Sequence, residues 1–252
     1  MLPLPLDSMS LAIVILGAFV AGFTTGFAGF GTGLVASGLW YHALPAAMVP
    51  PLVALASVAA QVVGLVAVRK AFAWQRARPY LIGGAIGVPL GVLALTVAAP
   101  NVIRTSIGAF LIGYAAYQLA HRRRQPIGDW GGKPADTLIG VGGGFLGGFA
   151  GLSGPLPLIW LQLRGGDSER QRATYQPFNI VVLSLAALAM VLAGQITVPV
   201  LWMTLLCLPA TLLGAWIGAR AYVGISEQSF QRIVLALLLV SGAILLGQAL
   251  VR

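Results

Sequence analysis

The chain has 252 residues, of which 58 % are apolar and only 8 % are charged, and its mean hydropathy is +0.92. A soluble domain carries about 25 % charged residues, so the composition excludes an ordinary soluble domain and predicts a protein solvated by lipid. The net charge of +9 does not indicate a nucleic-acid partner, because the basic residues lie at the ends of apolar segments and not in one patch.

The apolar runs, taken in chain order, predict an all-α polytopic membrane protein with two repeats. The first repeat is expected over 1–120, with a helical hairpin at about 10–44 and helices at about 45–68, 80–99 and 103–120. A cytoplasmic linker follows at 121–136. The second repeat is expected over 137–252, with a hairpin at about 137–163 and helices at about 175–195, 198–219 and 230–251.

The N-terminal stretch is expected to remain in the mature protein. No Lys or Arg precedes Arg69, and a secretory signal peptide begins with a basic region.

Both hairpins are predicted from glycine-rich breaks that share four letters. The sequence GFAG stands at 26–29 and again at 148–151, each time inside an apolar run. A spanning helix needs about 20 residues, and the first run is too long for one helix. Two half-helices of roughly 13 residues would each reach about 20 Å, past the middle of the bilayer. Each break is therefore expected near the midplane.

The second half of the chain resembles the first beyond this motif. GVPLG at 87–91 corresponds to GAWIG at 214–218, and Pro51 and Pro177 fall at similar places. Arg104 opens the last apolar run of the first half as Arg232 opens that of the second. We therefore expect a duplication.

The basic residues indicate how the halves are oriented. If all eight runs crossed the membrane, the basic residues would divide almost evenly between its two sides. If the two broken runs are re-entrant hairpins, all except Arg104 and Arg252 lie on one side. The positive-inside rule favours the second topology. It makes the repeats inverted, both termini extracytoplasmic, and the links 69–79, 121–136, 164–173 and 219–229 cytoplasmic.

The breaks have the chemistry of an anion site. The second half-helix of each hairpin would start near the midplane, with unpaired N–H groups at the positive end of its dipole. Thr32 and Ser153 stand where helix caps are expected, and glycine allows close approach of a ligand. The candidate substrate-binding residues combine these tips with nearby polar side chains: Thr25, Gly29, Gly31, Thr32, Gly33, Gln61, Gly151, Ser153, Gly154, Gln176 and Asn179.

Several of these residue types have plainer roles. Glycines also allow helices to pack closely, and this is the interpretation for Gly87, Gly91, Gly214 and Gly218. A buried Thr or Ser usually bonds back to a carbonyl of its own helix. Gln61 (with Ser57 one turn before it), Gln176 and Asn179 could equally mark a pathway or link helices. Trp40 and Trp160 could line the site or anchor the chain at the membrane interface.

The ionisable residues exclude several kinds of site. The six acids are expected in links or at a terminus, so a carboxylate-based cation site or proton relay lacks its parts. A single cysteine and two histidines form no metal cluster, and no metal or cofactor is expected. Transport of an anion is the function that remains.

These features resemble the sulfite exporter TauE/SafE family of membrane permeases over essentially the whole chain. The resemblance lies in the two GFAG-type breaks, the R-x-R-A-T-Y-Q-P-F-N run at 170–179 and the G-x-x-x-G pairs. It implies a multi-pass inner-membrane permease, often an exporter, for small sulfur-containing anions such as sulfite, sulfonates or sulfoacetate. It also implies that the tip residues, Gly29, Gly31, Thr32, Gly33, Gly151, Ser153 and Gly154, contact the substrate. The partners expected are this anion, the lipid bilayer and, as an open question, a second copy of the chain.

Three alternatives remain at this stage. GLSG at 151–154 resembles the G-x-S-G string of rhomboid intramembrane proteases, with Ser153 as nucleophile, but no histidine follows position 121 to act as its base. A passive anion channel would use the same residues as a transporter. A membrane scaffold subunit would need the breaks only for assembly.

Overall fold

The computed structural model describes residues 7–68, 73–120, 127–165, 168–221 and 227–250. The described residues form helices and connecting turns, with no strand among them. The helices are α1 (Ser8–Ala28), α2 (Thr32–Trp40), the 3-10 turn η1 (Ala46–Met48), α3 (Val49–Val68), α4 (Trp74–Val97), α5 (Pro100–Ala120), α6 (Gly132–Ala150), α7 (Pro155–Arg164), α8 (Ser168–Leu192), α9 (Val198–Ala221) and α10 (Glu227–Leu250).

The helices suit a membrane. By length and composition, five candidate spans are found in the described ranges: Ser8–Ala28, Ala46–Val63, Trp74–Val97, Glu169–Leu192 and Val198–Ala221. Large apolar side chains such as Leu93, Val97 and Leu192 point away from the bundle and are exposed. The prediction of an all-helical membrane protein is therefore confirmed.

Both predicted hairpins are present, but their arms are unequal. α1 has 21 residues and α2 has 9, while α6 has 19 and α7 has 10. The expectation of two similar half-helices of roughly 13 residues is wrong. Glycines inside α1 and α6 do not stop these helices, because they pack against a neighbouring helix, and each helix ends only where a glycine turns to positive φ.

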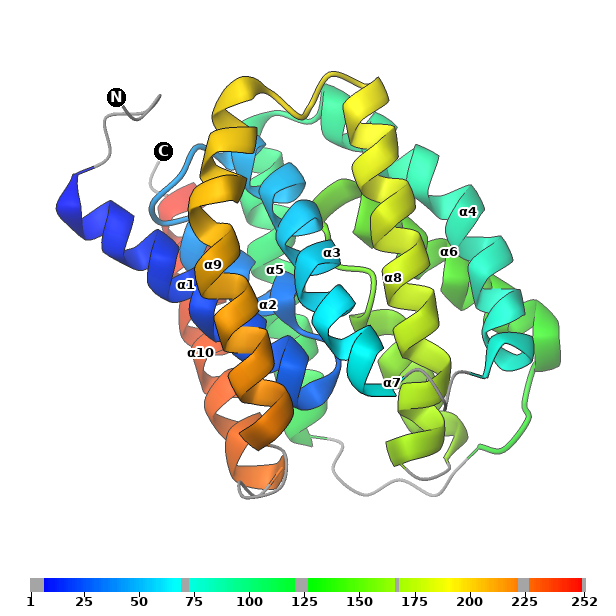
Figure 1. The fold of residues 1–252 in the computed structure, drawn as a ribbon. Helices are drawn as coiled ribbons and strands as arrows, with labels where there is room; N and C mark the ends of the chain where they lie inside the picture. The colour runs from blue at the N-terminus through cyan, green and yellow to red at the C-terminus, as the bar shows by residue number, and fades with distance from the viewer. Residues whose placement is uncertain (1–6, 69–72, 121–126, 166–167, 222–226, 251–252) are drawn as a thin grey trace.

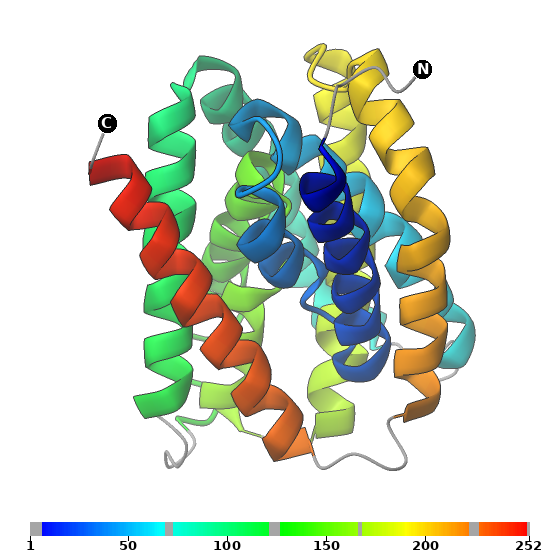
Figure 2. The ribbon, with the colours of Figure 1, turned by 90° about the vertical axis from the view of Figure 1, so that its left-hand side faces the viewer.

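The α1–α2 hairpin starts from the side of the bundle where α4 meets α5 and α8 meets α9 (Figure 1). The α6–α7 hairpin starts from the opposite side, and the two breaks meet inside the bundle (Figures 1 and 2). The predicted linker is shorter than expected, because α6 already begins at Gly132. Its residues 121–126 lie outside the described ranges.

Glycine seams hold each long hairpin arm against a distant helix. A Cβ added to Gly87 or Gly91 of α4 would lie 2.1 Å from a carbonyl oxygen of α6. A Cβ added to Gly214 or Gly218 of α9 would lie 2.1 or 2.2 Å from a carbonyl oxygen of α1. The interpretation of these four glycines as packing residues is confirmed. Backbones in such contact gain dispersion and weak Cα–H···O interactions that no larger residue permits.

Candidate substrate site at the paired helix breaks

The two glycines of each GFAG motif have different tasks. The first, Gly26 or Gly148, packs on the backbone of α9 or α4. The last, Gly29 (φ 80°) or Gly151 (φ 72°), ends its helix in the left-handed region, where glycine carries no steric cost. The motif therefore brings a helix close to its neighbour and stops it three residues later.

Thr25 caps the start of α2 from the other arm of the hairpin. Its Oγ1 accepts the N–H of Thr32 at 2.9 Å, and the two threonine hydroxyls are hydrogen-bonded to each other. Thr32 is the first residue of α2, after Gly31 at φ 108°, so the expectation that Thr32 caps the helix is wrong. Thr24, in contrast, bonds back to the Val20 carbonyl of its own helix at 2.8 Å.

Ser153 also does not cap its helix. Its hydroxyl donates to Asn179 Oδ1 of α8 at 3.0 Å, and Gly154 occupies the N-cap position of α7. The first residue of α7 is Pro155, which has no N–H, so the second break offers fewer backbone donors than the first. An amide oxygen is a poor general base, so this geometry gives Ser153 no activation for a protease reaction.

The two breaks touch, and a small cavity lies beside them. A Cβ on Gly33 would lie 2.5 Å from the Gly151 carbonyl oxygen. Beside this contact lies a cavity, here called the tip cavity, with room of about 20 Å³ for the centre of a water molecule, which suffices for about one water. Its walls are Thr25, Phe30, Gly31, Thr32, Gly33, Leu34, Ser57, Gln61, Gly151, Leu152, Ser153, Gly154, Pro155, Asn179 and Leu183.

The structure thus brings together all the candidate site residues except Gly29 and Gln176. Gly29 lies behind the cavity, where its carbonyl accepts from Gln61 Nε2 at 3.4 Å. Gln176 is buried next to Gly29, and neither atom of its amide has a partner among the described residues. These two residues support the break from outside the cavity.

The walls of the tip cavity offer donors and no carboxylate. The N–H groups of Gly33 and Leu34, at the start of α2, have no backbone acceptor within the described ranges, because the first N–H groups of an α-helix have no partner in the helix. The hydroxyl of Ser57 on α3 is buried and unpartnered there too. Unpaired donors at the positive end of a helix dipole favour an anion.

A cation and a phenol cover the end of α1. Arg172 Nη2 donates to the Gly26 carbonyl at 3.5 Å, and the Tyr175 hydroxyl donates to the Ala28 carbonyl at 2.5 Å. Both side chains belong to α8. The last carbonyls of a helix are acceptors without a partner at its negative end. The charge of Arg172 therefore offsets the negative end of the α1 dipole, and the start of α2 remains the positive helix end at the break.

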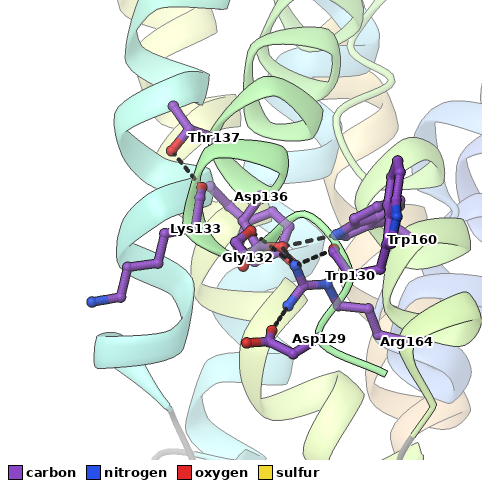
Figure 3. Close-up of polar contacts among 9 residues, drawn as sticks. Asp129, Trp130, Gly132, Lys133, Asp136, Thr137, Trp160 and Arg164 are labelled. Atoms are coloured by element: carbon purple, nitrogen blue, oxygen red, sulfur yellow. Dashed lines mark hydrogen bonds and ion pairs between the residues drawn. The ribbon is translucent and has the colours of Figure 1, made fainter. Parts of the chain in front are cut away.

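The prediction that all six acids lie in links or at a terminus is wrong for one buried carboxylate, Asp136. Asp136 was expected in a cytoplasmic linker, but it lies in the second turn of α6 and is only 8 % exposed. Its Oδ1 accepts from the Tyr80 hydroxyl at 2.6 Å and from Trp160 Nε1 at 2.8 Å, and it pairs with Arg164 at 3.2 Å (Figure 3). The sequence signal for this cluster was the spacing of one acid and one arginine at the two ends of the hairpin.

Trp40 and Trp160 each join the two arms of one hairpin. Trp160 of α7 reaches Asp136 of α6, as described, and Trp40 of α2 donates to the Val14 carbonyl of α1 at 3.0 Å. Neither lines the tip cavity. The hairpins are therefore closed by indole hydrogen bonds at the end opposite the break.

Comparison with known proteins agrees with the resemblance seen in the sequence. The model of the family "Sulfite exporter TauE/SafE" matches residues 14–245, nearly the whole chain. Neither the curated proteins nor the solved structures give a match. The matched range contains both hairpins, the tip cavity and the helices that surround it, and the chain therefore belongs to the sulfite exporter TauE/SafE family of membrane transporters.

Proposed function

We propose that the chain is an inner-membrane transporter, working as an exporter, of a small sulfur-containing anion of the sulfite, sulfonate or sulfoacetate class. The observation that carries this proposal is the tip cavity, which two helix breaks line with hydroxyl and N–H donors and without a carboxylate. Family membership supports the substrate class.

The proposal includes two inverted repeats, in which α1 to α5 correspond to α6 to α10. Under this correspondence the packing of α4 on α6 becomes that of α9 on α1, and both pairs are glycine seams. The packing of α3 on α9 becomes that of α8 on α4, and both are also present. Inverted repeats with broken helices at a central site are typical of secondary transporters.

The size of the tip cavity favours a carrier over a channel. The cavity holds about one water molecule, whereas a sulfur oxyanion has four or more heavy atoms. The site must therefore open to admit the anion, as alternating access of one repeat against the other would require. A passive channel would need a continuous open pore.

Anion binding by the purified protein tests the proposal. Thermal stability and calorimetry would be compared with sulfite, sulfoacetate, taurine, sulfate and chloride, for the parent chain and for Thr32→Val and Ser153→Ala. We expect a sulfur oxyanion to stabilise the parent selectively and the two variants much less. If no anion stabilises the parent chain, the proposed anion site is contradicted. Single-channel currents in lipid bilayers would instead show that the protein is a channel and not a carrier.

A further inference from the structure

The tip cavity adjoins a second, larger cavity, and the two share three wall residues. The second cavity, here called the inner cavity, has room of about 140 Å³ for water centres. Both cavities are lined by Phe30, Gly31 and Leu34. Of these three, Phe30 has the largest side chain, and it is half-buried.

The inner cavity lies toward the side of the bundle from which the second hairpin starts. Its walls include Gln162 near the end of α7, Gln171 near the start of α8, and Leu235 in the first half of α10. Figure 1 shows these helix ends on the side opposite the start of α1.

A third cavity lies next to the inner cavity on this side of the bundle. Gln171 lines both, and the third cavity has room of about 550 Å³. Four basic residues lie on its walls, Arg76, Lys133, Arg164 and Arg170, against two acids, Asp129 and Asp136. Neighbouring cavities therefore share wall residues from the break to a predominantly basic recess, and Phe30 is the one aromatic side chain common to the tip and inner cavities.

Phe30 lies in the short connection between α1 and α2. Phe30 stands outside the helices, between Gly29 at φ 80° and Gly31 at φ 108°. Glycines in a connection between two helices can serve as hinges, because they adopt positive and negative φ at little steric cost. Its ring packs edge-on against Tyr175, with centroids 5.8 Å apart and an interplanar angle of 81°, and Tyr175 is itself fixed to the Ala28 carbonyl. Edge-to-face pairs are a favoured aromatic arrangement, so the contact with Tyr175 stabilises the observed position of the Phe30 ring.

We propose that Phe30 is the inner gate of the substrate pathway, closing the tip cavity against the inner cavity and swinging away from Tyr175 when the anion passes. The inference deepens the proposed transport function, and its test needs no substrate. The second break carries Leu152 at the corresponding position after GFAG. Leu152 lines the tip cavity but not the inner cavity, and it is therefore the matched control.

A reporter cysteine in the tip cavity tests the gate. The starting protein is the full chain with Cys207→Ala, which removes the one native thiol, and Ser57→Cys. The rate at which 2-sulfonatoethyl methanethiosulfonate modifies this cysteine is measured in inside-out membrane vesicles. We expect Phe30→Ala to raise the rate several-fold and Phe30→Trp to lower it, whereas Leu152→Ala leaves it unchanged.

Equal rates in the starting protein, Phe30→Ala and Phe30→Trp would overturn the gate, as would acceleration by Leu152→Ala alone. If Phe30→Ala does not fold, the Trp variant decides, because the inner cavity has room for the larger ring. Anion binding without any effect of Phe30 on labelling would leave the proposed function standing and remove the gate. Labelling that depends on Phe30, without any anion binding, would support the gate and contradict the proposed anion site.

Discussion

Thr25 and Thr32 hold the first break together across the two arms of one hairpin. The Thr25 hydroxyl oxygen accepts the backbone N–H of Thr32 at 2.9 Å, and the two side chains share a further hydrogen bond. Both residues are buried. A helix start inside the bundle is thereby satisfied by a residue seven positions earlier in the chain.

Replacing Thr25 with valine should destabilise the protein. Thr25→Val keeps the shape of the side chain but leaves a buried N–H and a buried hydroxyl without their partner, at a cost of about 1–3 kcal/mol. Thr24→Val is the control, since Thr24 only bonds back to a carbonyl within α1. Thermal unfolding in detergent should show a clear loss for the first variant and little for the second. If both variants lose the same thermal stability, the hydrogen bonds between Thr25 and Thr32 do not contribute more to stability than the bond of Thr24 within its own helix.

The glycine seams predict opposite effects for two Gly→Ala changes. In Gly144→Ala the new Cβ would lie 2.4 Å from the Gly84 carbonyl oxygen, so α4 and α6 must separate, at about 1–3 kcal/mol or more. Gly113 of α5 has nothing within 4 Å of an added Cβ, and Gly113→Ala should stabilise its helix by about 0.5–1 kcal/mol. Melting temperatures that fall for one variant and rise for the other would agree with the seam.

Ser57 allows substrate binding to be separated from stability. Its buried hydroxyl has no partner among the described residues and faces the tip cavity. We expect Ser57→Ala to weaken sulfite binding roughly fivefold to tenfold, as expected for the loss of one hydrogen bond of about 1–1.5 kcal/mol. The variant should be no less stable than the parent in the absence of anion.

Ser37→Ala is the matched control for that experiment. Ser37 is equally buried and also unpartnered in the described part of the chain, but it lines none of the cavities described above. Calorimetric affinity for sulfite should be unchanged in this variant. If both variants bind as the parent does, Ser57 does not contact the anion.

The Asp136 cluster predicts a large loss of stability from one acid and a small loss from its neighbour. Asp136→Asn removes the charge that holds Arg164, Tyr80 and Trp160 together, at a cost of about 3 kcal/mol. Asp129 also pairs with Arg164, but its side chain is 88 % exposed, so Asp129→Asn should cost under about 1 kcal/mol. Denaturation of the two variants under the same conditions compares them directly.

Cysteine labelling tests the proposed orientation. With Cys207 replaced by alanine, Asp129→Cys precedes α6 and Gln195→Cys lies between α8 and α9. We expect a membrane-impermeant thiol reagent added to intact spheroplasts to label position 195 and not position 129. Inside-out vesicles should give the opposite result, and any other pattern would reverse or reject the orientation.

Much of the fold could be predicted because each break has a strong local cause. The GFAG motifs indicated where α1 and α6 end, and Gly29 and Gly151 do end them. The lengths of the arms could not be predicted, because Gly22 and Gly26 look like helix breakers in the sequence. They remain helical because α9, distant in the chain, packs on them.

The structure brings most of the candidate site residues together, whereas the hydrogen bonds expected of Thr32 and Ser153 as helix caps are not formed. Thr32 and Ser153 stand at cap-like positions, but their partners are Thr25 and Asn179, which only the folded hairpins bring near. Phe30 gave no signal as an apolar residue in an apolar run. Asp136 was assigned to a linker because its partners, Tyr80 and Trp160, lie far away in the sequence.

The packing of α1 on α9 has a consequence for how the protein is made. Among the described helices the ribosome synthesises α1 before α9, yet the glycine face of α1 finds its partner only when α9 has been synthesised. The carbonyls at the end of α1 also wait for Arg172 and Tyr175 of α8. The contacts of α1 with α8 and α9 can therefore form only after both of these later helices have been synthesised.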